Sequence, residues 1–123
     1  MQITNNFKLT LYLLDLSGLK SFVKIRKLFY KYSDAVLLLF DYTNNNTFER
    51  LTDWIDESRH FLKDNTTPII LLGNKFDKIE DREYIKSKTN KLAEQYNFPF
   101  FETSAITGEG IDELFTYLIS ILF

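Results

Sequence analysis

The chain has 123 residues, enough for one domain with a substantial hydrophobic core. Its 45% hydrophobic and 26% charged residues are typical of a globular protein, and a net charge of −2 without blocks of like charge argues against a nucleic-acid partner or an anionic membrane surface. The chain has no cysteine, which excludes disulfides, cysteine-based metal sites and a lipid anchor on cysteine, so we expect a cytoplasmic protein that meets membranes only through partners.

The predicted elements begin with a strand. In residues 7–13, apolar side chains alternate with more polar ones, the pattern of a strand with one buried face. Residues 20–32 are expected to form a helix, although their apolar positions are irregularly spaced. Residues 35–40 are apolar without alternation, which is typical of a strand covered on both faces. Thr47 is expected to cap the next helix, whose apolar face contains Phe48, Leu51, Ile55 and Leu62.

The second half of the chain continues this alternation. Pro68 precedes a short buried strand at residues 69–72, and another short strand is expected at residues 98–101. Between them, residues 81–96 are expected to form a helix whose inward face is made of Ile85, Leu92, Ala93 and Tyr96. The last helix has the clearest apolar face, formed by Ile111, Leu114, Phe115, Leu118, Ile119 and Leu122. Strands alternating with helices of this length predict an α/β fold with a mostly parallel sheet.

The candidate site is the polar segment Gly73-Asn74-Lys75-Phe76-Asp77, directly behind the strand at residues 69–72. In an open α/β sheet, ligands bind at the carboxyl ends of strands, where this segment falls. The Asp77 carboxylate can accept two parallel hydrogen bonds from the N1–H and exocyclic amine of guanine, a donor pair that adenine lacks. The alkyl stem of Lys75 can lie along the base, and the Asn74 amide can join neighbouring loops.

Two further motifs also follow strand-like runs, namely Asp15-Leu16-Ser17-Gly18 and Glu102-Thr103-Ser104-Ala105. With Asn74-Lys75-Phe76-Asp77, their order and spacing resemble the Asp-x-x-Gly, Asn-Lys-x-Asp and Ser-Ala motifs of the small GTPases of the Ras superfamily. The segments between them, including residues 39–44 and 108–115, look most like the Rab branch. The resemblance extends from about residue 9 to the end of the chain. It implies a three-layer α/β fold like that of P-loop NTPases, with helices on both faces of the sheet.

The resemblance implies a vesicle-traffic switch that takes GTP or GDP with Mg²⁺. The implied guanine-binding residues are Asn74, Lys75, Asp77, Ser104 and Ala105, with the Ala105 N–H on the guanine carbonyl oxygen. Asp15 would reach Mg²⁺ through a water molecule, and Gly18 would offer its N–H to the terminal phosphate. The helix from Lys20 to Tyr32 corresponds to the region through which the family contacts protein effectors and regulators.

The chain departs from the family at two points. These 123 residues contain no Gly-x-x-x-x-Gly-Lys-Ser/Thr phosphate loop. By resemblance, the first strand, this loop, the first helix and the first switch region would precede Met1, so we expect residues 1–123 to form an incomplete small-GTPase domain that binds nucleotide weakly. In addition, Leu19 stands where the family has the glutamine that orients the attacking water, so we expect very slow hydrolysis.

Three interpretations remain open at this point. The favoured one is a truncated Rab-like GTPase, since three guanine-nucleotide motifs survive together. The second is a nucleotide-independent interaction module with Phe22, Phe29 and Tyr30 as its contact surface, although core packing explains these side chains more simply. The third is that Met1 is an internal residue of a longer chain. By resemblance, the missing first strand would lie between the strands at residues 7–14 and 35–40. Its loss predicts a marginally stable sheet, in which these two strands either pair directly or leave an exposed edge.

Overall fold

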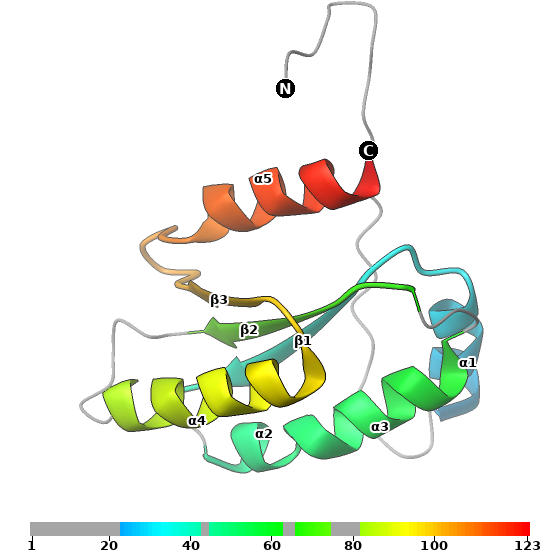
Figure 1. Cartoon of the computed structure of the whole chain (residues 1–123), viewed down its shortest axis with the longest axis horizontal. Coiled ribbons are helices and arrows are strands. Elements are labelled where there is room, and N and C mark those ends of the chain that lie inside the picture. The colour runs from blue at the N-terminus through cyan, green and yellow to red at the C-terminus, as the bar shows by residue number, and fades with distance from the viewer. Residues whose placement is uncertain (1–22, 43–44, 63–65, 75–81) are drawn as a thin grey trace, which may run out of the picture.

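The computed structural model describes residues 23–42, 45–62, 66–74 and 82–123, and Figure 1 shows their arrangement. Five helices and three strands occur in these ranges. In chain order they are α1 (Val23–Lys31), β1 (Val36–Asp41), α2 (Asn45–Glu49), α3 (Leu51–Phe61), β2 (Ile69–Asn74), α4 (Arg82–Tyr96), β3 (Phe100–Thr103) and α5 (Ile111–Leu122). The strands form a parallel sheet in the order β1-β2-β3, which confirms the predicted α/β fold with a parallel sheet.

The central strand β2 is covered on both faces. Its four residues from Ile69 to Leu72 are all buried, as expected for a continuous apolar run in a parallel sheet. Because side chains alternate along a strand, Ile69 and Leu71 belong to one half of the core, and Ile70 and Leu72 belong to the other. The unbroken hydrophobicity of this segment therefore comes from two separate layers of packing.

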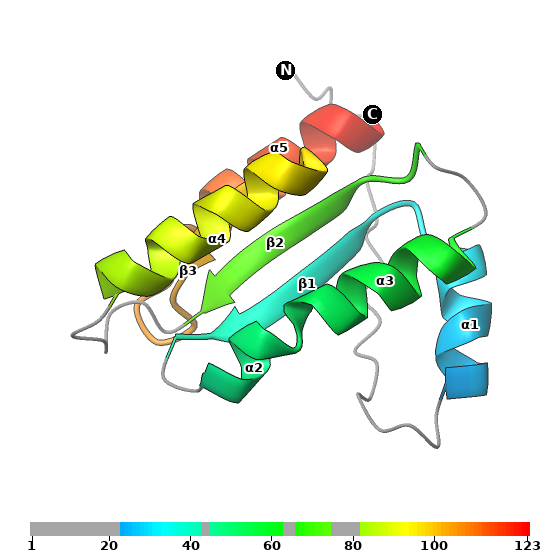
Figure 2. The ribbon, with the colours of Figure 1, turned by 60° about the horizontal axis from the view of Figure 1, so that its bottom comes forward.

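Helices cover the two faces of the sheet unequally. Helices α2, α3 and α4 pack on the face that carries Leu38, Phe40 and Leu71, where Leu51, Ile55 and Ile85 complete the larger cluster. Helix α5 lies alone on the opposite face among the described elements, and its Leu114 and Leu118 contact the smaller cluster around Ile70 and Leu72. Figure 2 shows α3 and α4 together in front of the sheet. The predicted inward faces of α4 and α5 are thus largely confirmed.

The expected helix cap at Thr47 is wrong. Thr47 lies inside α2, and its hydroxyl accepts a hydrogen bond from the Asp41 N–H (2.8 Å) and donates one to the Asp41 carbonyl (3.2 Å). The Thr47 hydroxyl is therefore hydrogen-bonded to the backbone at the end of β1 and does not cap a helix. The predicted single helix is divided at Arg50 into α2 and α3.

Two strand boundaries also differ from expectation. β2 continues through Gly73 and Asn74, which the pattern had assigned to a loop. β3 begins at Phe100 rather than at residue 98, because Asn97 ends α4 in the left-handed conformation (φ 58°) and the Phe98 N–H bonds back to the Ala93 carbonyl. This arrangement is a Schellman motif, in which Phe98 still completes the helix end.

The edge of β1 that does not pair with β2 is the edge beside which the sequence predicts a missing strand. Within the described residues, β1 pairs only with β2, and its Leu39 side chain is exposed. The strand predicted at residues 7–13 lies outside the described residues. Direct pairing between that strand and β1 therefore stays a prediction.

Candidate nucleotide site at the carboxyl ends of the strands

The three parallel strands end together at one edge of the sheet. Asp41 pairs in register with Asn74, and Asn74 pairs with Thr103. The segments that follow these strands therefore start side by side, where an open α/β sheet binds its ligands. This register brings two of the sequence motifs, the one that starts at Asn74 and the one that contains Ser104, to neighbouring strands.

Of the seven predicted site residues, the structure describes Asn74, Ser104 and Ala105. Asn74 is half-buried at the end of β2, and its carbonyl accepts a hydrogen bond from the Tyr42 N–H (3.1 Å). Ala105 is exposed directly after the buried Ser104. The four others are outside the described residues: Asp15, Gly18, Lys75 and Asp77.

Ser104 organises the turn that follows β3. Its N–H donates to the Glu109 carbonyl (3.0 Å), its carbonyl accepts from the Gly108 N–H (2.8 Å), and its hydroxyl oxygen accepts from the Thr107 N–H (3.2 Å). The Ser104 side chain is fully buried, while its partners Thr107, Gly108 and Glu109 lie at the surface. The buried serine thus holds a closed turn, at whose start the exposed Ala105 is presented.

Two glycines shape the end of this turn. Gly108 (φ 80°) and Gly110 (φ 79°) both adopt the left-handed conformation that side-chain-bearing residues rarely take. A Cβ at Gly110 would also collide with the backbone carbonyl of Glu102, whereas one at Gly108 would meet open space. Gly110 therefore lets the turn pack directly on β3 before α5 begins.

A polar cluster that the sequence reasoning did not assign lies beneath this edge. The Tyr42 hydroxyl donates to the Glu102 carboxylate (2.7 Å), and the same carboxylate lies 3.3 Å from the Lys86 ammonium. A Cβ on Gly73 would lie only 2.7 Å from the nearest atom of the Tyr42 ring and would collide with it. The one available signal was a tyrosine directly after β1 and a glycine near the end of β2, in a sheet whose strands end in register.

Comparison with known proteins agrees with this architecture. The sequence model of the Ras family matches residues 1–123. The chain belongs to the Ras family. It is similar to mouse (Mus musculus) Ras-related protein Rab-26, with 35% identity over 112 residues, or 91% of this chain and 43% of that protein. It is also 34% identical to Rab-4 of Dictyostelium discoideum over 110 residues (89% of this chain, 52% of the relative) and 31% identical to rat (Rattus norvegicus) Rab-27B over 116 residues (94% and 53%). The chain spans about half the length of these curated relatives.

A second polar cluster joins α1 to α3 in this Ras-family chain. Arg26 is buried (4% exposed), and its guanidinium makes two hydrogen bonds to the Glu57 carboxylate, at 3.1 and 2.7 Å. The Tyr30 hydroxyl donates to the same carboxylate at 2.8 Å. The Arg26 guanidinium also lies over the ring of Trp54, 5.1 Å from its centroid. Bidentate, charge-assisted bonds of this kind fix both position and orientation, so α1 is held firmly on α3.

The ionisation of this second cluster follows from its surroundings. Burial raises the pKa of the Tyr30 phenol to about 12. The hydrogen bond with Ser58 lowers this pKa, but by less than burial raises it. Burial alone would raise the pKa of the Glu57 carboxyl, but hydrogen bonds from Arg26 and Tyr30, with the Arg26 charge, lower it below its ordinary value of 4.5. The hydrogen bond to Glu57 raises the pKa of the Arg26 guanidinium. At neutral pH, the cluster is therefore an ion pair with a neutral phenol.

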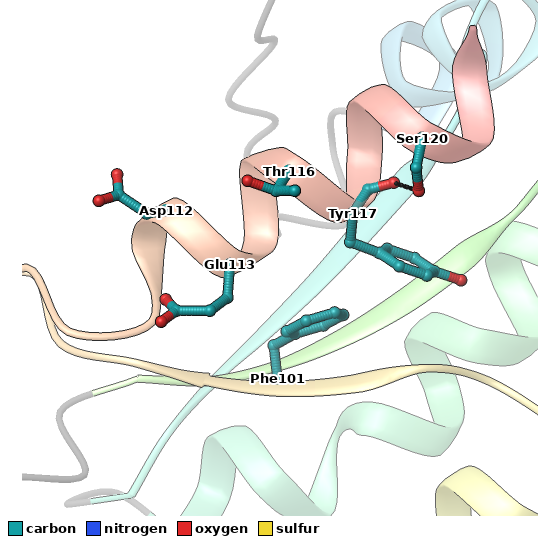
Figure 3. A pocket seen from close by; sticks show the side chains of 6 residues that line it. All are labelled: Phe101, Asp112, Glu113, Thr116, Tyr117 and Ser120. Carbon is teal, nitrogen blue, oxygen red and sulfur yellow. Dashed lines mark hydrogen bonds between the residues drawn. The ribbon is translucent and has the colours of Figure 1, made fainter. Parts of the chain in front are cut away.

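Two surface pockets of the described residues lie away from the strand ends. Figure 3 shows the larger one, between β3 and α5, where the rings of Phe101 and Tyr117 face each other (centroids 5.2 Å apart). It is lined by Phe101, Asp112, Glu113, Thr116, Tyr117 and Ser120. It contains none of the predicted site residues. Among the described residues, no group of three histidine, cysteine or acidic side chains could hold a metal ion, and no helix is long and apolar enough to cross a membrane.

Proposed function

We propose that this chain carries the base-recognising half of a Rab-type guanine-nucleotide site. The register of β2 with β3 supports the proposal, because the segments after Asn74 and Thr103 then begin side by side. In this proposal, Asp77 accepts the paired N–H groups of guanine, and the exposed Ala105 offers its N–H to the guanine carbonyl oxygen. Lys75 lies along the base, while Asn74 and Ser104 hold the two loops in place.

The fit to the nucleotide differs between its two ends. At the base end, the buried and fully bonded Ser104 provides the rigid support that a shape-specific pocket needs. At the phosphate end, we assign only Asp15, for water-mediated contact with Mg²⁺, and Gly18. When bound, Mg²⁺ would neutralise phosphate charge. Since these 123 residues contain no phosphate loop, we expect binding weaker than micromolar.

Nucleotide titration of the isotopically labelled 123-residue chain tests this function. With Mg²⁺ present, GDP should shift the amide resonances of Asn74 and Ser104 at lower concentration than ADP does. Asp77→Ala should abolish this preference, because the carboxylate that distinguishes the bases is lost. The matched control Asp112→Ala, an exposed acidic residue of α5, should keep it. Equal responses to GDP and ADP would overturn the base half of the proposal, and sub-micromolar affinity would overturn the expected weakness.

We also propose that this chain hydrolyses GTP very slowly even when a phosphate loop is supplied. Leu19 has no hydrogen-bonding group with which to orient water. The test is single-turnover hydrolysis by a chain extended with the family's N-terminal region. Turnover comparable to that of the same chain with Leu19→Gln would contradict this expectation.

The outer face of α1 is the proposed contact for protein partners, within the segment from Lys20 to Tyr32. Ile25 and Leu28, one helical turn apart on α1, are 48% and 59% exposed, and Tyr32, directly after the helix, is 73% exposed. Three exposed lysines accompany them: Lys24, Lys27 and Lys31. Tyr30 is buried against α3, as the favoured core packing predicts and a contact role does not. Phe29 is half-buried, and Phe22 lies outside the described residues.

A pulldown distinguishes switching from nucleotide-independent contact at α1. Partners captured by the chain should be lost with Leu28→Glu, which places a charge in the exposed apolar stripe. Capture that depends on GTP rather than GDP supports the switch. Equal capture with GTP, with GDP and without nucleotide supports a nucleotide-independent module instead. The matched control is Tyr84→Glu on α4, which changes an exposed aromatic residue on another helix.

A further inference from the structure

Tyr42 contacts the ends of all three described strands. It directly follows β1, its backbone N–H donates to the Asn74 carbonyl at the end of β2 (3.1 Å), and its hydroxyl donates to the Glu102 carboxylate on β3 (2.7 Å). Its ring also covers Gly73, where any side chain would collide with it. With 1% of its surface exposed, Tyr42 touches no ligand itself. It can act on a ligand only through the groups that it holds.

Tyr42 contacts Gly73 and Glu102, which lie within two residues of the proposed guanine-binding residues Asn74 and Ser104. Gly73 precedes Asn74, and Glu102 is two residues before Ser104. The Glu102 backbone carbonyl, in turn, is covered by Gly110, which ends the turn that Ser104 organises. A change at the Tyr42 hydroxyl is therefore transmitted to the turn at Ser104 through the Glu102 carboxylate and β3, which pairs with the end of β2 at Asn74. Charge-assisted hydrogen bonds in a buried setting are strong enough to set such a relative position.

We propose that Tyr42 is a positioning residue for guanine recognition, which holds the turn at Ser104–Ala105 in place beside the end of β2 at Asn74 through its bond to Glu102. This inference rests on the proposed function, since it assumes that this turn forms part of the base site. In the proposed function the turn offers the Ala105 N–H to the guanine carbonyl oxygen, so a small displacement of the turn weakens guanine binding more than non-specific nucleotide contact. Lys86 forms an ion pair with the other oxygen of the same carboxylate, 3.3 Å from it, and so helps to orient Glu102.

The test is Tyr42→Phe in the 123-residue chain, because this substitution removes the hydroxyl and leaves the ring over Gly73. The readout is the ratio of GDP to ADP response at fixed subsaturating nucleotide, measured on the amide resonances of the folded protein. We expect the ratio to fall roughly tenfold. A purely structural role would lower the fraction folded without changing this ratio. The matched control Tyr84→Phe, at an exposed tyrosine of α4, should leave the ratio unchanged.

A double-mutant comparison tests the route through Glu102. If Tyr42 acts through this carboxylate, Glu102→Gln should lower the ratio by itself, and the double variant should lose no more than the more damaging single variant. A wild-type chain that prefers GDP, together with an unchanged preference in Tyr42→Phe, would overturn this inference and leave the proposed function intact. A wild-type chain without any preference for GDP would overturn both.

Discussion

The attachment of α1 to α3 gives the sharpest stability prediction. In Arg26→Met, the Glu57 carboxylate loses both guanidinium hydrogen bonds and keeps the one from Tyr30. Breaking a buried ion pair by removing one partner costs about 3–5 kcal/mol, and because 17% of the Glu57 side chain is still exposed, we expect about 3 kcal/mol. A domain of 123 residues has a free energy of unfolding of about 6 kcal/mol at the low end of the usual range. The substitution should therefore remove roughly half of the stability.

Urea unfolding at neutral pH measures this loss, with helix circular dichroism and the fluorescence of Trp54 as two probes. Trp54 is the single tryptophan of the chain and lies under the Arg26 guanidinium, so it reports on the same contact. The double variant Arg26→Met/Glu57→Gln should recover part of the loss, because no buried charge is then left unpaired. The control is Arg50→Met at an exposed position, which should change stability by less than about 0.5 kcal/mol.

The pH dependence of this pair has a definite sign. Because the folded-state pKa of Glu57 is below its ordinary value of 4.5, the stabilising contribution is fully present above that value and is lost as the pH falls through the folded-state pKa. Glu57→Gln should remove this part of the acid sensitivity. A loss under about 1 kcal/mol in Arg26→Met, or an unchanged acid profile in Glu57→Gln, would refute a buried and energetically important ion pair.

Three further predictions concern the turn, the core and the buried phenol. Gly110→Ala should destabilise the chain by several kcal/mol more than Gly108→Ala in urea unfolding, because only the first adds a collision to the left-handed backbone strain; equal losses would contradict this. Leu71→Ala, in the fully buried centre of β2, should cost about 2–5 kcal/mol, whereas Leu39→Ala at an exposed position should cost little; similar costs would mean that the two faces are covered alike. Stability should fall as the pH rises from 10 to about 12, because the folded-state pKa of Tyr30 is raised and its contribution is lost there; alkaline unfolding of Tyr30→Phe should lack this component.

The order of strands and helices was predictable from the sequence. Residues 35–40 and 69–72 are continuous apolar runs, which predict parallel strands covered on both faces. Residues 69–72 are buried as predicted, whereas the coverage predicted for 35–40 is wrong at Leu39, which is exposed. The inward faces of α4 and α5 followed from helical spacing, since Ile85, Ala93, Leu114 and Leu118 are buried as expected. These features depend on local periodicity, and the information for it is contained within each segment.

The packing of α1 was not predictable in this way. The apolar positions of residues 20–32 are irregularly spaced and define no single inward face, and in the structure Ile25 and Leu28 are exposed while Arg26 is buried. A buried arginine is stable only opposite a carboxylate, and that carboxylate, Glu57, is 31 residues further along the chain. The local pattern therefore could not identify the buried face of this helix.

The sequence by itself determined that the chain alternates strands with helices and places Asn74 and Ser104 just at or behind strand ends. Only the tertiary structure decided that these ends are in register, and that the Tyr42 hydroxyl meets Glu102 across 60 residues of sequence. The physical reason is that strand order and buried polar bonds arise from long-range pairing, which no single segment encodes. Periodicity indicates which residues are buried, but the hydrogen-bond partners of buried polar groups depend on the tertiary structure.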